Sequence, residues 1–203
     1  RVQAERNIKR GEIMGLKLIT APASTPVSLV EVKSYMRELT TDQDTLFTSL
    51  IAAATSYLDG PNGYLGRAII TQTWELYLDD FSSAIRIPFG PVASVTSVKY
   101  YDTAGSLQTI DSANYAVDLT SSDQWIVPVS TYSWPAVAPG INNVIIRFVA
   151  GEATAPEAIK AAIHMLIAQW FEMPEASSDK PVTELPHAVS ALLANFRGYG
   201  FGA

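Results

Sequence analysis

The stretch that decides the fold is residues 144–172, VIIRFVAGEATAPEAIKAAIHMLIAQWFE. Its opening residues are mostly β-branched or aromatic, which is typical of a strand, and Gly151 ends that strand. Pro156 then opens a helix, because proline fits the first helical turn, where its missing N–H has no partner to lose. The helix runs to about Glu172. Its apolar face comprises Ile159, Ala162, Ile163, Leu166, Ile167 and Trp170.

The region from residue 68 to residue 150 has the pattern of an antiparallel sheet. Residues with β-branched or aromatic side chains are separated by turn residues at roughly regular spacing. Residues 102–105 are expected to turn one hairpin. Pro128, Pro135 and Pro139 mark edges or loops, because proline cannot donate to a strand ladder. The expected strands are residues 69–78, 84–88, 95–101, 107–110, 115–119, 125–129 and 143–149.

Two helices are expected before the sheet region. Ser28 and Glu31 form a capping box, which predicts a short helix over residues 29–38. Apolar residues at helical spacing then predict a second helix through about residue 58. The sequence DGPNG follows it, and two glycines with a proline cannot continue the helical hydrogen bonds.

The chain is therefore expected to be an α+β protein, a small helical bundle with an inserted antiparallel β module. Residues 173–185 are polar and bracketed by prolines, which favours an exposed loop, and Pro186 starts a last short helix. The expected organisation is an N-terminal extension and extended entry (1–27), the first half of the helical part (28–66), the β module (67–150), the second half of the helical part (151–197) and a flexible tail (198–203).

Residues 1–13 hold several basic residues and little apolar periodicity, so we expect them to lie outside the core. Lys9 to Glu12 can be encoded by a purine-rich stretch that resembles a ribosome-binding site. That would make Met14 a natural start, and the sequence leaves this question open.

Composition excludes several classes of function. Hydrophobic residues make up 48% of the chain and charged residues only 17%, and this thin charge suggests extensive contact between subunits. No run of about 18 apolar residues and no signal peptide pattern occurs, so synthesis and assembly in the cytoplasm are expected. The absence of cysteine removes disulfides and thiolate chemistry. The net charge of −6 argues against a broad nucleic-acid-binding surface.

No catalytic or cofactor motif is present, and we expect neither enzyme activity nor a cofactor or metal. His164 lies among apolar residues of a helix and His187 in a first helical turn. Both favour a packing or surface role, because catalysis needs a base, a nucleophile and an orienting group together. The carboxylate pairs lack the ligand spacing of a metal site and suit a strand end and a helix start; they are Asp79 with Asp80 and Asp42 with Asp44.

Aromatic residues in the sheet region allow a different function. Trp125, Tyr132 and Trp134, with prolines nearby, are compatible with a sugar-binding platform. The chain would then be a β-rich binding module that recognises a glycan or host surface. Aromatic residues at this density in a β module more often fill a core or a subunit contact.

Several segments, in order from about Leu18 to Arg197, resemble the head-tail connector proteins of siphophages, prophages and gene-transfer particles. The first are LITAPASTPVSLVEVKSYMREL (18–39), DQDTLFTSLIAAATSYLDG (42–60) and GRAIITQTWELYLDDF (66–81). They are followed by IRIPFGPVASVTSVKYYDTAG (85–105), NYAVDL (114–119) and the stretch at 144–172. The basic extension and the glycine-aromatic tail have no counterpart in that family.

The resemblance implies a head-completion adaptor of the virion neck, assembled in the host bacterial cytoplasm. It implies a ring, of 12 subunits in the family, beneath the portal protein. The ring extends the DNA channel and provides a platform for a head-tail stopper or tail-completion protein. DNA passes through the lumen without specific binding, and the acidic balance suits a lumen that repels phosphates.

The C-terminal end is the expected contact with the portal. An apolar stripe, a planar donor and two aromatics between glycines can anchor a segment that orders on docking. The alternative is that the stripe caps the bundle of its own subunit and the tail frays. The residues concerned are Val189, Leu192, Leu193, Phe196, Arg197, Tyr199 and Phe201.

Overall fold

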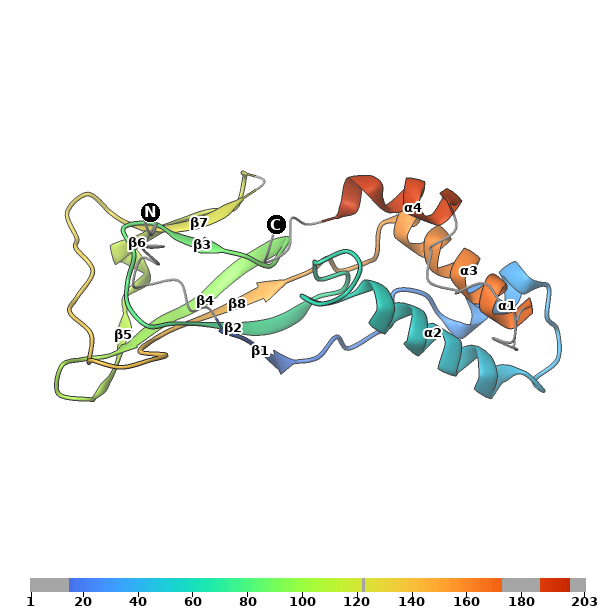
Figure 1. Cartoon of the computed structure of the whole chain (residues 1–203), viewed down its shortest axis with the longest axis horizontal. Coiled ribbons are helices and arrows are strands. Elements are labelled where there is room, and N and C mark those ends of the chain that lie inside the picture. The colour runs from blue at the N-terminus through green and yellow to red at the C-terminus, as the bar shows by residue number, and fades with distance from the viewer. Residues whose placement is uncertain (1–14, 122, 173–186, 198–203) are drawn as a thin grey trace, which may run out of the picture. The chain divides into compact units, whose positions relative to one another are not determined.

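The computed structural model describes residues 15–121, 123–172 and 187–197, which fold as two compact units (Figure 1). The β unit contains residues 15–21 and 72–150, and the helical unit contains residues 22–71 and those described from 151 onward. The α+β fold class expected from the sequence is confirmed.

The β unit contains two antiparallel sheets. The five-stranded sheet has the order β1 (Gly15–Thr20), β2 (Gln72–Leu78), β8 (Val144–Ala150), β4 (Val92–Tyr101) and β5 (Leu107–Ile110). The three-stranded sheet has the order β3 (Ile85–Ile87), β7 (Gln124–Pro128) and β6 (Tyr115–Asp118), with the short 3-10 helix η1 (Ser112–Asn114) before β6.

The core of the β unit lies between the two sheets (Figure 1). Buried and half-buried residues alternate along β8, and its pairing with β2 and β4 places the buried ones on one side. Trp74 of this sheet packs edge-on against Phe89, with ring centroids 4.8 Å apart. The other buried contributors include Leu76, Ile146, Phe148, Val98, Ile85, Ile87 and Ile126.

Several boundaries of the sheet differ from those expected from the sequence, and β4 begins at Val92 instead of residue 95. Residues 15–20, expected to belong to an extended entry, form strand β1 and pair with β2. β2 itself begins at Gln72 instead of residue 69, because Ile69 and Ile70 belong to the core of the helical unit. The apolar residues at positions 69 and 70 were expected in the strand but belong to the helical unit. The predicted hairpin turn is confirmed: the Asp102 carboxylate accepts the N–H groups of residues 104 and 106.

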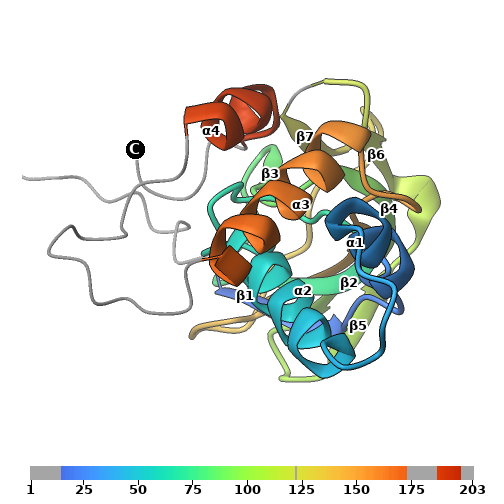
Figure 2. The ribbon, with the colours of Figure 1, turned by 90° about the vertical axis from the view of Figure 1, so that its right-hand side faces the viewer.

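The helical unit contains α1 (Leu29–Met36), α2 (Asp44–Leu58), α3 (Glu157–Glu172) and α4 (His187–Leu193), followed by the 3-10 helix η2 (Ala194–Phe196) (Figure 2). The predicted capping box at Ser28 is present, with both reciprocal hydrogen bonds formed. α2 and α3 supply most of the core, and Phe47 stacks on Phe171 with centroids 5.1 Å apart.

The junction between β8 and α3 depends on Gly151. It has a φ of +95°, and a Cβ added there would lie 2.3 Å from the carbonyl oxygen of Ile70. Only glycine fits this combination of left-handed backbone and close approach. Ile70 also bridges Glu152, so the start of the α3 segment is fixed against the end of the α2 segment.

Candidate assembly surfaces

The C-terminal residues expected to contact the portal divide into buried and exposed sets. Val189 and Leu193 are fully buried in the core of the helical unit. Phe196 is half-buried there, with the Arg67 guanidinium 5.7 Å from its ring centroid. Much of the stripe therefore stabilises its own subunit, which is the alternative that the sequence left open.

The exposed set is smaller. The side chain of Leu192 is 36% exposed, and the Arg197 guanidinium lies 4.7 Å from the ring centroid of Tyr64. Tyr199 and Phe201 lie outside the described residues. Within the described chain, Leu192 and Arg197 are the members of the set that a partner can reach.

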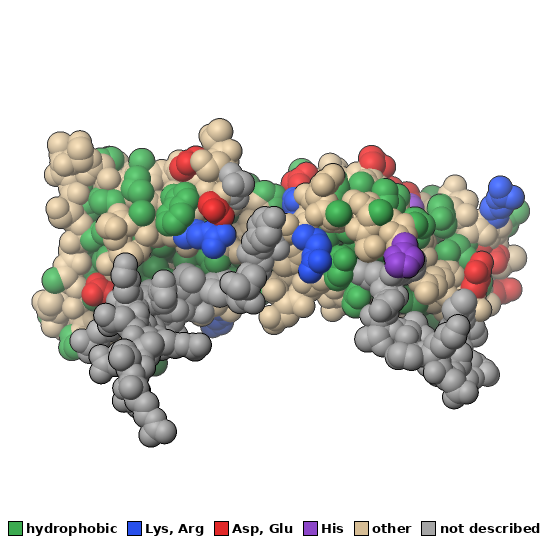
Figure 3. Space-filling view, turned by 45° about the horizontal axis from the view of Figure 1, so that its top comes forward, with side chains coloured by type: hydrophobic (Ala, Val, Ile, Leu, Met, Phe, Trp, Pro, Cys, Tyr) green, Lys and Arg blue, Asp and Glu red, His purple; other side chains and the backbone are tan. Residues whose placement is uncertain are grey.

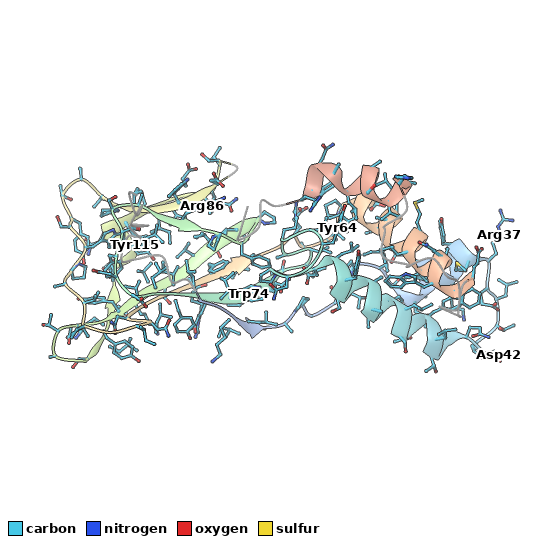
Figure 4. All side chains as sticks on the ribbon, viewed as in Figure 1. Arg37, Asp42, Tyr64, Trp74, Arg86 and Tyr115 are labelled. Atoms are coloured by element: carbon cyan, nitrogen blue, oxygen red, sulfur yellow. The ribbon has the colours of Figure 1, made fainter. Side chains whose placement is uncertain are left out.

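The segment around α1 contains the most exposed large aliphatic side chains among the described residues of the helical unit. Val30 is 76% exposed and Leu39, in the α1–α2 connection, is 95% exposed. Figure 4 labels Arg37 and Asp42 at the same end of the helical unit. We call Val30, Tyr35 and Leu39 the α1 surface. Neither capping nor the core uses Val30 or Leu39.

Ion pairs hold α1 in place while leaving that surface free. The Lys33 ammonium lies 2.6 Å from a carboxylate oxygen of Asp44 at the start of α2. Lys160 of α3 lies 3.6 Å from Glu31 and 3.1 Å from Glu157. Hydrogen bonds from Ser28 hold the pKa of Glu31 below its ordinary value, so this carboxyl remains charged near neutral pH.

His164 packs as an aromatic ring. It stacks on Tyr35 with centroids 5.0 Å apart and an interplanar angle of 16°. Burial lowers the pKa of His164, which favours the neutral imidazole. Its Nε2 is buried without a hydrogen-bond partner in the described structure. The stacking on Tyr35 and the burial of the ring are those of the packing residue expected from the sequence.

The remaining polar candidates have local roles. His187 lies at the start of α4, and its carbonyl oxygen accepts the Ser190 hydroxyl. Asp44 forms the ion pair to Lys33, Asp79 accepts the N–H of Asn142, and Asp80 accepts that of Phe81. Asp42 is exposed in the α1–α2 connection. The described residues contain no group of three or more His, Asp and Glu placed to hold a metal ion.

Two of the three aromatics suggested for sugar binding meet in one cluster. Trp134 stacks on Phe81 with centroids 4.8 Å apart, and Tyr132 meets Trp134 edge-on. Trp125 belongs to a different place, the β7 strand, opposite Arg86. One face of the Trp134 ring is therefore covered by Phe81 within the subunit, and Trp125 does not share this cluster.

A network that the sequence analysis did not identify lies on the five-stranded sheet. Arg147 donates from Nε and Nη2 to one oxygen of Glu75, at 2.9 and 2.6 Å, and the Tyr77 hydroxyl donates to the other at 2.5 Å. Burial alone raises the pKa of Glu75, but these hydrogen bonds together hold it below its ordinary value. The hydrogen bond from the Tyr77 hydroxyl to Glu75 raises the pKa of Tyr77 to about 12. The sequence signal for this network was Glu75, a charged residue between the apolar Trp74 and Leu76.

Charged side chains are scattered among apolar and uncharged ones on the face seen in Figure 3. No helix within the described ranges has the length and apolar character needed to cross a membrane.

Comparison with known proteins identifies the fold. No protein-family description and no curated protein matches the sequence. Among solved structures, a chain from "Neck of empty GTA particle computed with C6 symmetry" is 23% identical, covers 90% of this chain and 95% of its own length, and has a TM-score of 0.71.

Two further structures agree. A chain from "Virion of native gene transfer agent (GTA) particle" is 22% identical, with a TM-score of 0.65, and covers 90% of this chain and 94% of its own length. A chain from "Neck of native GTA particle computed with C12 symmetry" has the same identity and coverage and a TM-score of 0.61. Across nine-tenths of its length, the protein therefore has the fold of chains from gene transfer agent particles, including their necks.

Proposed function

We propose that the chain is a non-enzymatic structural protein of the neck of a tailed phage or phage-like particle. The observation that carries the proposal is the fold match to a neck chain over 90% of one protein and 95% of the other. Because the match covers 90% of this chain and 95% of the other, it includes most of both the helical unit and the β unit. A likeness confined to one sheet would carry much less.

The finer proposal is a head-tail adaptor that forms a ring of 12 subunits beneath the portal. The ring extends the DNA channel and offers a platform to a head-tail stopper or tail-completion protein. Thin charge and the exposed α1 surface support repeated contact between copies, since large exposed apolar side chains gathered in one segment favour interaction sites. The net charge of −6 suits passage of DNA without adhesion.

Portal contact is proposed at the C-terminal end, from Leu192 and Arg197 onward. Leu192 offers exposed apolar surface. Arg197 offers a planar cation whose stacking on Tyr64 leaves its side chain exposed. Residues of these two kinds commonly anchor a segment in a groove of a partner.

The test compares the full chain with a chain truncated after Phe196, which keeps Val189, Leu193 and Phe196 in the core. Light scattering after size exclusion, alone and with the portal protein of the same particle, reports the ring and its docking. We expect a folded truncated protein that no longer binds portal, and particles that lack tails or leak DNA. Unchanged portal binding and infectivity would contradict a portal contact from Arg197 onward. A monomer that binds glycans would favour the β-rich binding module.

A further inference from the structure

Charge in the β unit is divided between its two sheets. The outward side of the five-stranded sheet carries Lys17, Glu75 and Arg147 side by side, because β1, β2 and β8 pair them directly. Lys99 joins them from β4, where it pairs with Ile145, two residues from Arg147 along β8. Three cations and one carboxylate give this positive face a net charge of +2. The described residues place no other charge on these outward strand positions.

The rest of the β unit is acidic. Its other described charges are Arg86 and six aspartates, which sum to −5. The aspartates are Asp79, Asp80, Asp102, Asp111, Asp118 and Asp123. A protein with an overall charge of −6 thus concentrates positive charge on one flat side of one sheet.

The outward side of the three-stranded sheet offers the complementary surface, which we call the acidic face. Arg86 points outward there between two buried isoleucines, and Asp123 binds it at 2.6 Å. Asp118 pairs opposite Trp125 and has no cation bound to it among the described residues. Two carboxylates and one guanidinium leave a net charge of −1, and Figure 4 labels Arg86 on this sheet.

Both faces also present apolar surface at their centres. On the positive face, Tyr77, Ile145 and Val149 are half-buried and share the side of the sheet that carries Glu75 and Arg147. On the acidic face, Trp125 is half-buried and Val127 is 36% exposed. Apolar and aromatic side chains surrounded by complementary charge are typical of protein interfaces.

We propose that the positive face of one copy binds the acidic face of the next, so that β units stack head to tail around the ring. The proposal rests on the proposed ring function and names its lateral contact. Contacts between two different faces of a subunit generate closed rings when the rotation closes. A contact of the positive face with itself would place +2 against +2, whereas the head-to-tail contact joins opposite charges.

The absence of cysteine allows a direct test by cross-linking. Ser97→Cys introduces a thiol on the positive face, since Ser97 pairs with Arg147. Ala116→Cys introduces one on the acidic face, since exposed Ala116 pairs with Val127. Both changes are small and leave every charge in place. A short bismaleimide is applied to particles assembled with each variant, or to the concentrated purified chain when a variant does not enter particles.

The double variant is expected to give a ladder of covalent oligomers, while each single variant stays monomeric, because each contact joins one thiol of each kind. Dimers from Ser97→Cys alone would show a symmetric contact and overturn the proposal. So would the absence of a ladder from a double variant that keeps the wild-type melting temperature. Mass spectrometry of purified particles distinguishes this result from failure of the proposed function. If the chain is present in the particles but no ladder forms, the proposed function stands and only this lateral contact is wrong.

Charge reversal supplies the second measurement. Lys17→Glu with Lys99→Glu, added to the double-cysteine variant, is expected to reduce the ladder at least several-fold, and raising salt should weaken the wild-type contact as well. An unreduced ladder would contradict the electrostatic contact. A third outcome is that no ladder forms, the wild type binds duplex DNA, and the charge reversal abolishes that binding. The positive face would then be a nucleic-acid-binding surface, which would overturn the proposal.

Discussion

The helical unit and the β unit use their charged residues differently. In the helical unit, Lys33 and Lys160 are paired with carboxylates that fix α1 against its neighbours. In the β unit, Lys17 and Lys99 form no ion pair with a described residue and lie on an outward sheet face. The β unit also has internal ion pairs, Arg147 with Glu75 and Arg86 with Asp123, but its two lysines remain unpaired on the sheet surface. The difference teaches that the lysines that hold α1 stabilise the subunit, whereas Lys17 and Lys99 remain available for a second molecule.

The largest expected effect is on the core of the helical unit. Leu166 is 2% exposed, and Leu166→Ala should lower the free energy of unfolding by about 2 to 5 kcal/mol, because it removes buried methyl groups and leaves a cavity. Leu50 is only partly buried against the same core, so Leu50→Ala should cost less. Chemical denaturation measures both. Wild-type stability in both variants would mean that α2 and α3 do not form the core.

The Glu75 network should have the next largest effect. Arg147→Met leaves Glu75 buried without its cation and should cost about 1 to 2 kcal/mol, a value reduced for the partly exposed guanidinium. Because the pKa of Glu75 is lowered in the folded protein, its contribution is present above the ordinary carboxyl pKa and is lost as pH falls. The wild-type and variant stabilities, measured by urea unfolding, should therefore converge in acid. A difference that is equal at every pH would contradict this assignment.

In the helical unit, the contact between His164 and Tyr35 of α1 should make stability sensitive to mild acid. Burial lowers the pKa of His164 in the folded protein. At mildly acidic pH this histidine is therefore protonated more readily in the unfolded chain than in the folded one. The groups that face it are Tyr35 and Glu31 from α1 and Lys160 and Glu157 on α3. Stability should be full above the ordinary histidine pKa and fall as pH decreases below it. His164→Gln should flatten this part of the profile, and an unchanged slope would contradict the role of the ring.

The sequence predicted the helices better than it predicted the sheet. α2 and α3 have apolar faces set by residues three and four apart, so their local pattern was sufficient. β1 is exposed along nearly its whole length and lacks alternation, and only its pairing with the distant β2 makes it a strand. Ile69 and Ile70 looked like strand residues because apolar character alone does not tell which unit will bury them.

The candidate surfaces were predicted only in part for the same reason. Val189 and Leu193 were recognised as an apolar stripe, but their burial depends on packing against α3 and the rest of the core. The positive face joins four residues from four strands, spread from Lys17 to Arg147. These residues lie far apart in the sequence, and only the pairing register of the strands brings them onto one face.

The smallest expected effect on stability is at the positive face. Lys17→Glu with Lys99→Glu should change the free energy of unfolding by only about 0.5 kcal/mol per site, because neither lysine forms an ion pair with a described residue and Lys17, opposite Glu75, is exposed. Thermal unfolding of the purified chain measures this. A large loss of stability would mean that the face serves the fold of its own subunit, and the contrast between the two units would disappear.

A cryo-EM reconstruction of the neck of particles that carry this chain tests the proposed adaptor ring most directly. The map should show a ring of 12 copies of this fold between portal and tail, with the channel open through its centre. Particles that complete their heads and tails without the chain, or a map that places it in a fibre or on the capsid surface, would contradict the claim.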